Sequence, residues 1–143
     1  MDPQIHQLLT LQAKILRLKT KGREMQEELL RIFNLPDFTA IISKVSFDQG
    51  KLSFVLLGQE YYTYVVVSAD DNGVYSFGQL NTYFQFKPIG KKELDEPIQI
   101  YSEKFDGMGN INQKFTIDDF GFNYIKGLVG EINKNPKLII FRD

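Results

Sequence analysis

The fold class is decided by residues 41–73, IISKVSFDQGKLSFVLLGQEYYTYVVVSADDNG. Apolar and polar side chains alternate there with a period of two on both sides of residues 48–50, as in strands joined by a hairpin turn. Gly58 begins a second turn, and Asn72-Gly73 suits a type I′ hairpin. Connections this short join antiparallel neighbours, whereas parallel strands need a long crossover. The stretch therefore predicts an antiparallel meander.

The meander continues on the C-terminal side of this stretch. Residues 74–77 and 82–86 keep the strand pattern with Gly78 between them, and residues 98–101 predict a further short strand. Residues 137–141 predict a last strand, apolar on both faces, that enters the sheet or pairs with another chain. We expect about five to seven strands. Residues 52–57 and 61–67 are apolar on both faces, so each face needs cover from a helix, a partner or a ligand.

A long amphipathic helix precedes the sheet. Asp2 and Pro3 form a start signal, and the strong helix formers last until Phe33. Apolar residues recur at alternating spacings of three and four, which is a coiled-coil seam, with Gly22 in one slot: Leu8, Leu11, Ile15, Leu18, Met25, Leu29 and Ile32. Two readings stay open, because further apolar residues widen the stripe as in a helix that packs on its own sheet: Ile5, Leu9, Leu16, Leu30 and Phe33. Whether the helix continues through Gly22 also stays open.

A second helix is predicted near the C-terminus. Thr116 is its expected cap, with Asp119 three residues later as in an acidic capping box. An apolar stripe follows at four-residue spacing, and Asn135-Pro136 ends the helix. We therefore expect an α+β fold in which the helix of residues 1–34 and the sheet and closing helix of residues 35–143 form one structural unit.

Composition excludes several classes of protein. The chain has 143 residues, a net charge of −1, no cysteine and a single histidine, His6. These counts rule out disulfides, thiolate zinc sites and cysteine nucleophiles, and nearly exclude a Ser-His-Asp triad. A cationic run without an acid follows in the first helix, but stacking aromatics are not interleaved with it, so nucleic acid is not the expected partner: Lys14, Arg17, Lys19, Lys21 and Arg23. Neither a signal peptide nor an apolar run of the ~20 residues that span a membrane is present, and we expect a cytoplasmic or other intracellular protein.

No catalytic motif stands out. The sequence contains neither a phosphate-binding loop nor a nucleophile elbow, and its paired carboxylates read as a turn, a helix cap and a solvated helix face: Asp70/Asp71, Asp118/Asp119 and Glu27/Glu28. Asp106, Asn110 and Asn112 resemble calcium ligands, but Met108 occupies the third position of that loop, where an oxygen donor belongs. We expect no metal and no cofactor. Carboxylates that converge only in the folded chain remain the enzymatic alternative.

In element order alone, a heptad helix followed by a meander and a closing helix resembles the RWD-type domains of kinetochore and related scaffold proteins. The Pro-x-x-Tyr-Pro turn of many such domains is absent, and no functional residue is carried over. The same order suits toxin-neutralising immunity proteins, secretion chaperones and cone-shaped NTF2-like folds. We expect a non-enzymatic scaffold, adaptor or inhibitor that binds another protein or a second copy of itself through the helix or an aromatic sheet face, with an NTF2-like ligand pocket or enzyme as the alternative. The expected contact residues are Leu8, Leu11, Ile15, Leu18, Met25, Tyr62 and Tyr64.

Overall fold

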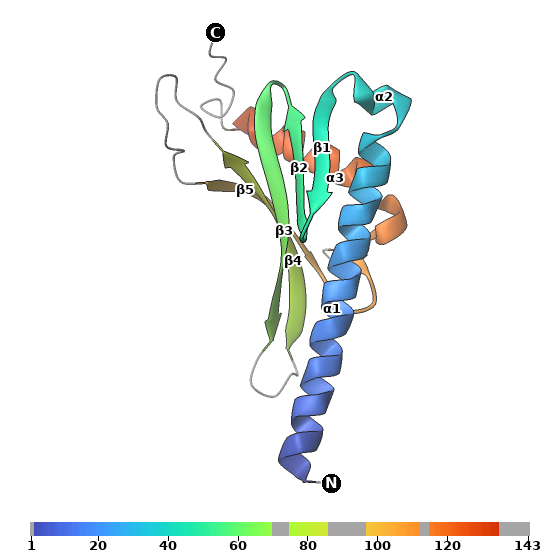
Figure 1. The fold of residues 1–143 in the computed structure, drawn as a ribbon, viewed down its shortest axis with the longest axis vertical. Coiled ribbons are helices and arrows are strands. Elements are labelled where there is room, and N and C mark those ends of the chain that lie inside the picture. The colour runs from blue at the N-terminus through green and yellow to red at the C-terminus, as the bar shows by residue number, and fades with distance from the viewer. Residues whose placement is uncertain (1, 70–74, 86–96, 112–114, 135–143) are drawn as a thin grey trace.

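A computed structural model describes residues 2–69, 75–85, 97–111 and 115–134 of the chain (Figure 1). Three helices and seven strands are assigned within these ranges. The helices are α1 (Pro3–Phe33), α2 (Pro36–Thr39) and α3 (Ile117–Lys134). The strands are β1 (Ile42–Asp48), β2 (Lys51–Leu56), β3 (Gln59–Ala69), β4 (Ser76–Gln85), β5 (Ile98–Phe105), β6 (Asn110–Ile111) and β7 (Phe115–Thr116). This layout confirms the α+β fold predicted from the sequence.

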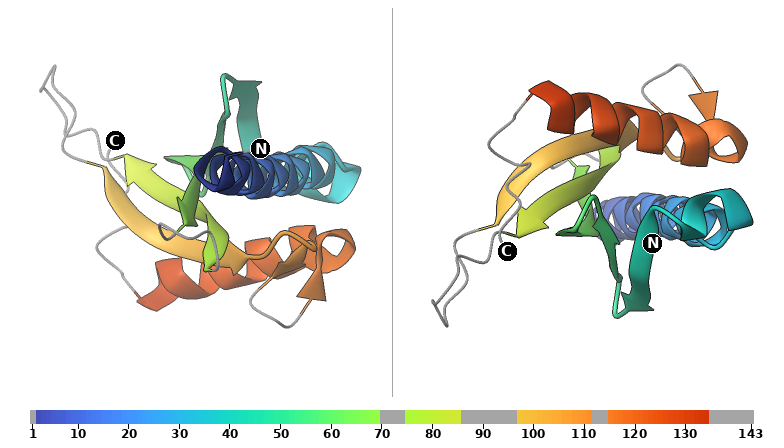
Figure 2. Two further views of the ribbon diagram at one scale, coloured as in Figure 1. Left: turned by 90° about the horizontal axis from the view of Figure 1, so that it is seen from below. Right: turned by 90° about the horizontal axis from the view of Figure 1, so that it is seen from above.

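The strands form one antiparallel meander in the order β1-β2-β3-β4-β5-β6-β7. Asp48 pairs with Lys51 across the first hairpin, and Ala69 pairs with Ser76 across the third, so the pairings expected on both sides of residues 48–50 and 70–73 are confirmed. Gln49 and Gly50 in the first turn have positive φ angles of 50° and 78°, which glycine adopts without strain. Viewed along α1, the sheet curves round the helix, with β1 and β2 on one side and β4 and β5 on the other (Figure 2).

Several elements differ from the sequence expectation. β4 is one strand that runs through Gly78, where the ring of Phe105 lies so close that an added Cβ would sit 2.1 Å from its Cζ atom. The helix α1 is unbroken at Gly22, which answers the question that the sequence left open. A single turn of helix, α2, follows Leu35, and β6 lies inside the calcium-like loop that begins at Asp106. In each case a close tertiary contact or a local turn overrides the weak signal of a glycine or a proline.

Both long helices pack on the same face of the sheet. Thr63 of β3 and Thr82 of β4 are cross-strand partners; the first bonds Gln26 of α1, and the second bonds the hydroxyl of Tyr124 in α3. Between the helices and the sheet lies a continuous row of aromatic rings. The centroid distances are 4.7 Å from Phe33 to Phe54, 5.7 Å from Phe54 to Tyr61 and 5.6 Å from Tyr61 to Phe84. The concave side of the sheet is therefore filled by side chains of the core.

Some expectations lie outside the described residues. They are the last strand at residues 137–141 and the turn at residues 70–73. The helix α3 does begin directly after Thr116, its predicted cap, but the side chains of Thr116 and Asp118 are not described. None of the described helices is long and apolar enough to cross a membrane.

Candidate functional site

The helix α1 divides near Leu18, where burial begins, into an N-terminal projecting half and a C-terminal packed half. Its first turns extend past the described ends of β3 and β4, as Figure 1 shows in blue. Asp2 caps this end, because its carboxylate accepts a hydrogen bond of 2.9 Å from the backbone N–H of Gln4. The projecting half therefore begins with a capped N-terminus.

Large apolar side chains are exposed on the projecting half. Leu8 is 64% exposed, Leu16 54%, Ile5 51% and Leu9 49%. A surface helix that belonged only to its own domain would turn such residues towards the sheet. We call this set of four side chains the projecting strip. It lies partly on the predicted seam, through Leu8, and partly on the side of the helix that the sequence analysis attributed to intradomain packing.

The predicted seam is split between the two halves. Leu11 and Ile15 are half-buried at the point where the sheet begins. Leu18 and Met25 are 1% and 0% exposed, inside the core, and have no surface left for a partner in this structure. The packed half therefore fits the intradomain interpretation of the stripe, and the coiled-coil interpretation stays a prediction for the projecting half.

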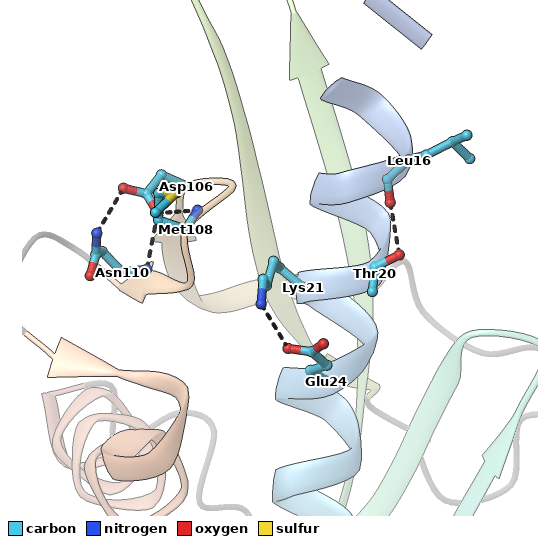
Figure 3. Close-up of polar contacts among 7 residues, drawn as sticks. All are labelled: Leu16, Thr20, Lys21, Glu24, Asp106, Met108 and Asn110. Atoms are coloured by element: carbon cyan, nitrogen blue, oxygen red, sulfur yellow. Dashed lines mark hydrogen bonds and ion pairs between the residues drawn. The ribbon is translucent and has the colours of Figure 1, made fainter. Parts of the chain in front are cut away.

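Charge is distributed unevenly along α1. Residues 3–23 contain five Lys and Arg residues and no Asp or Glu. Two of these cations form ion pairs with acids of the next turn: Lys21 with Glu24 at 3.3 Å (Figure 3) and Arg23 with Glu27 at 3.1 Å. Lys19 has no ion-pair partner in the described part of the chain. On the flank of the helix beside the projecting strip, the cations are Lys19 and Arg23.

A groove of about 900 Å³ runs along this cationic flank. Its helix wall consists of Ile15, Lys19, Arg23 and Gln26. Opposite lie the β1–β2 turn, residues 47–50, and the last residues of β3. Gln26 fixes the two walls relative to each other, because its side-chain amide donates to the carbonyl oxygen of Gly50 at 2.9 Å and to Oγ1 of Thr63 at 3.1 Å. This groove was not predicted from the sequence.

Tyr62 and Tyr64, the two predicted contact residues of the sheet, lie on the face opposite the helices. Tyr62 stacks on Tyr83 at 5.3 Å between centroids and meets Tyr64 edge-on at 5.7 Å. The ammonium of Lys51 lies 4.7 Å from the centroid of the Tyr62 ring. Burial, and then the neighbouring Tyr64 and Tyr83, raise the pKa of Tyr62. This tyrosine face and the seam residues of α1 lie on different sides of the sheet, so the structure does not bring the two predicted sets together.

The calcium-like loop has its oxygens engaged by its own backbone. Asp106 accepts hydrogen bonds from the N–H groups of Met108 at 2.9 Å and Asn110 at 3.0 Å, and from the side-chain amide of Asn110 at 3.2 Å (Figure 3). Burial alone raises the pKa of Asp106, but the hydrogen bonds from Asn110, Met108 and Gly109 outweigh it and lower the pKa. The Asp106 carboxylate therefore holds a turn. Within the described ranges, no three His, Asp or Glu side chains gather as metal ligands would.

Glu103 is the one acidic side chain buried within the described core. It accepts a hydrogen bond from the hydroxyl of Tyr101, two residues earlier on β5. Tyr124 of α3 lies edge-on to Tyr101 at 5.5 Å, and burial raises the pKa of Tyr124. This polar group lies between β5 and α3, inside packed aromatic rings, and serves to join the helix to the sheet.

Comparison with protein families, with curated proteins and with solved structures gives no match for this chain. Its function therefore has to be inferred from the geometry of the surfaces described above.

Proposed function

We propose that this chain is a non-enzymatic protein–protein interaction module, of the scaffold, adaptor or inhibitor type, that associates through the projecting half of α1. The observation that carries the proposal is the projecting strip, four large apolar side chains on a helix that the domain itself leaves uncovered. Full burial of an exposed side chain of this kind is worth about 1.5–3 kcal/mol, and these four still expose about half of their surface or more. Contiguous apolar patches on a helix are typical of sites that another molecule covers.

The alternative, an enzyme or a ligand-binding protein with a pocket inside a curved sheet, has less support. Such a pocket needs an empty concave side, and here Phe54, Tyr61 and Phe84 meet the side chains of the two helices there. The tyrosine face offers a second protein-binding surface, but its rings are already engaged with one another and with Lys51. The side chains of the projecting strip would not have to give up contacts of this kind when a partner binds.

Site-specific photo-cross-linking in the producing cell tests the proposal. A photoreactive phenylalanine derivative replaces Leu9 in the projecting strip or, as a matched control, Lys126 on the exposed side of α3. We expect a discrete protein adduct from position 9 and none from position 126. Leu8→Glu with Leu16→Glu should remove the adduct without changing the melting temperature, because both side chains are exposed.

Two results would contradict the proposal. One is the absence of any adduct from position 9 while the chain is folded and abundant. The other is an adduct that persists when Leu8 and Leu16 are both glutamate, since the strip would then not be what the partner recognises.

A further inference from the structure

The strand β3 is longer than β2, which pairs with one of its two edges. It has 11 residues, and β4 pairs with it from Glu60 to Ala69. On the other side, β2 pairs only from Gln59 to Thr63, because the β1–β2 hairpin turns back at residues 48–50. Within the described residues, no strand pairs with the β2 side of β3 from Tyr64 to Ala69. At about 3.3 Å per residue, this open edge is about 20 Å long.

Backbone groups on this edge alternate in direction. The carbonyl oxygen of Thr63 points to the β2 side, since it pairs with Leu52 and also lies 3.4 Å from the side-chain nitrogen of Gln26. Because backbone groups of an antiparallel strand point to the same side at every second residue, Val65 and Val67 direct their N–H and C=O groups to the open edge. The pairing between β2 and β3 ends at Thr63, and beyond it, within the described residues, the edge of β3 presents unpaired backbone donors and acceptors to this side.

The groove along α1 lies directly on this edge. Val65, Val67 and Ala69 line it together with Ile15, Lys19 and Arg23 of the helix. The β1–β2 turn closes one end, and the volume of about 900 Å³ suits a short segment of chain. The groove is also pre-formed, because the amide of Gln26 ties the helix to Gly50 and Thr63. A pre-formed site spares an incoming segment part of the ordering cost of binding.

We propose that the open edge of β3 accepts an extended segment of the partner protein as an added strand, and that this segment carries acidic side chains opposite Lys19 and Arg23. The inference rests on the proposed function and specifies how the partner binds. Main-chain hydrogen bonds to Val65 and Val67 supply the pairing, as in other cases of strand addition. The apolar contacts come from Ile15 and the two valines.

Charge and continuity identify the occupant as acidic and as part of the same partner. Among the described residues that line the groove, Asp48 is the only acid, and Arg23 forms an ion pair with Glu27 at 3.1 Å. The projecting strip continues from the groove along the same flank of α1, since Leu9, Leu16 and Arg23 repeat every seven residues. A chain leaving the groove beyond Ala69 therefore meets the strip. A parallel pair of copies would instead bring Lys19 and Arg23 of one copy next to the same two cations of the other.

A peptide titration of the full chain tests the proposal. The probe is fluorescein-labelled Glu-Val-Thr-Val-Glu-Val-Thr-Val, with two further versions that are N-methylated on alternate residues, odd or even. A strand ladder uses one edge of the peptide, so one methylated version should bind at least about tenfold more weakly than the parent, while the other binds like it. In amide exchange, Val65 and Val67 should become protected in the complex.

Charge variants of the protein test whether Lys19 and Arg23 attract the acidic side chains of the probe. Lys19→Glu with Arg23→Glu should weaken the probe about tenfold and strengthen a version with Lys in place of Glu. The control Lys126→Glu with Lys134→Glu makes the same change in net charge on α3 and should leave binding unchanged. Val67→Pro removes one edge N–H and should abolish binding; the methylated probes test the same ladder with the unmodified protein if this variant does not fold.

The proposal is overturned if the parent probe shows no saturable binding, if both methylated versions bind like the parent, or if exchange protection falls on the tyrosine face instead. Concentration-dependent dimers that disappear with Val67→Pro would assign the edge to a second copy and would also overturn it. Any of these results leaves the adduct from position 9 intact if the proposed function holds, so the two failures are distinguishable.

Discussion

The two halves of α1 share one heptad pattern and have different surroundings. Leu8 and Leu29 occupy the same heptad position three repeats apart, yet Leu8 is largely exposed and Leu29 is completely buried. Met25 and Leu29 belong to the hydrophobic core, whereas the first turns of α1 lie beyond the described ends of β3 and β4 (Figure 1). The comparison shows that an apolar pattern specifies which face of a helix must be covered. What covers it is decided by where the sheet ends.

The largest expected effect separates the two leucines directly. Leu29→Ala should destabilise the fold by about 2–5 kcal/mol, because it leaves a cavity between the helix and the sheet. Leu8→Ala should change the stability by less than about 0.5 kcal/mol, because the side chain is exposed. Urea denaturation followed by circular dichroism measures both. Equal effects of the two substitutions would mean that the projecting half is as much part of the core as the packed half.

Two helical glycines, Gly22 in α1 and Gly130 in α3, should differ in the same direction but by less. A Cβ on Gly22 would lie 2.5 Å from Cγ1 of Val65, so Gly22→Ala should cost about 1–3 kcal/mol through overpacking, less the helix-propensity gain of about 1 kcal/mol. Gly130 in α3 has open space at the same position, and Gly130→Ala should stabilise the fold by about 0.4–1 kcal/mol. Thermal denaturation of the two variants compares them. Stabilisation by both would show that α1 does not approach β3 closely at Gly22.

The stability of the core beneath the packed half should fall at high pH. Burial raises the pKa of Tyr61 to about 12, from an ordinary value near ~10. The unfolded chain then loses this proton first, so the stability that the neutral tyrosine contributes is complete below pH ~10 and is lost as the pH rises through about 12. Denaturation midpoints measured from pH 8 to 12 should fall, and Tyr61→Phe should reduce the fall.

At neutral pH the same substitution should have the smallest effect. The Tyr61 hydroxyl is buried without a hydrogen-bond partner in the described part of the chain. Its removal should therefore be neutral or stabilising by up to about 1 kcal/mol. A clear loss of stability in Tyr61→Phe at pH 7 would show that this hydroxyl has a partner after all.

The sheet was predictable because its signals are local. The turn residues Gly50 and Gly58 and the alternation around them fix strand direction and pairing without knowledge of the rest of the chain. Gly78 misled the prediction, because its small size serves a contact with Phe105 on the next strand and not a break. A contact between residues 78 and 105 has no signature in either segment alone.

The candidate surfaces were predictable only in part. Of the projecting strip, only Leu8 belonged to the predicted seam, which also included the buried Leu18 and Met25. Separating the two sets requires the position of the sheet along the helix, which is a tertiary property. The groove depends on β2 being shorter than β3, and this difference was readable from the spacing of the turns. Its cationic wall was readable as well, but not its position beside the edge of β3.

Amide hydrogen exchange along α1 in the isolated chain tests the central claim most directly. A helical segment of about 15 residues without tertiary packing is marginal in water, so residues 4–15 should exchange by local fraying. Residues 22–33 should exchange only with global unfolding, and the change should fall near Leu18, where burial begins. Uniform protection of the whole helix at every protein concentration would contradict the account, since the projecting half would then be stable without any partner.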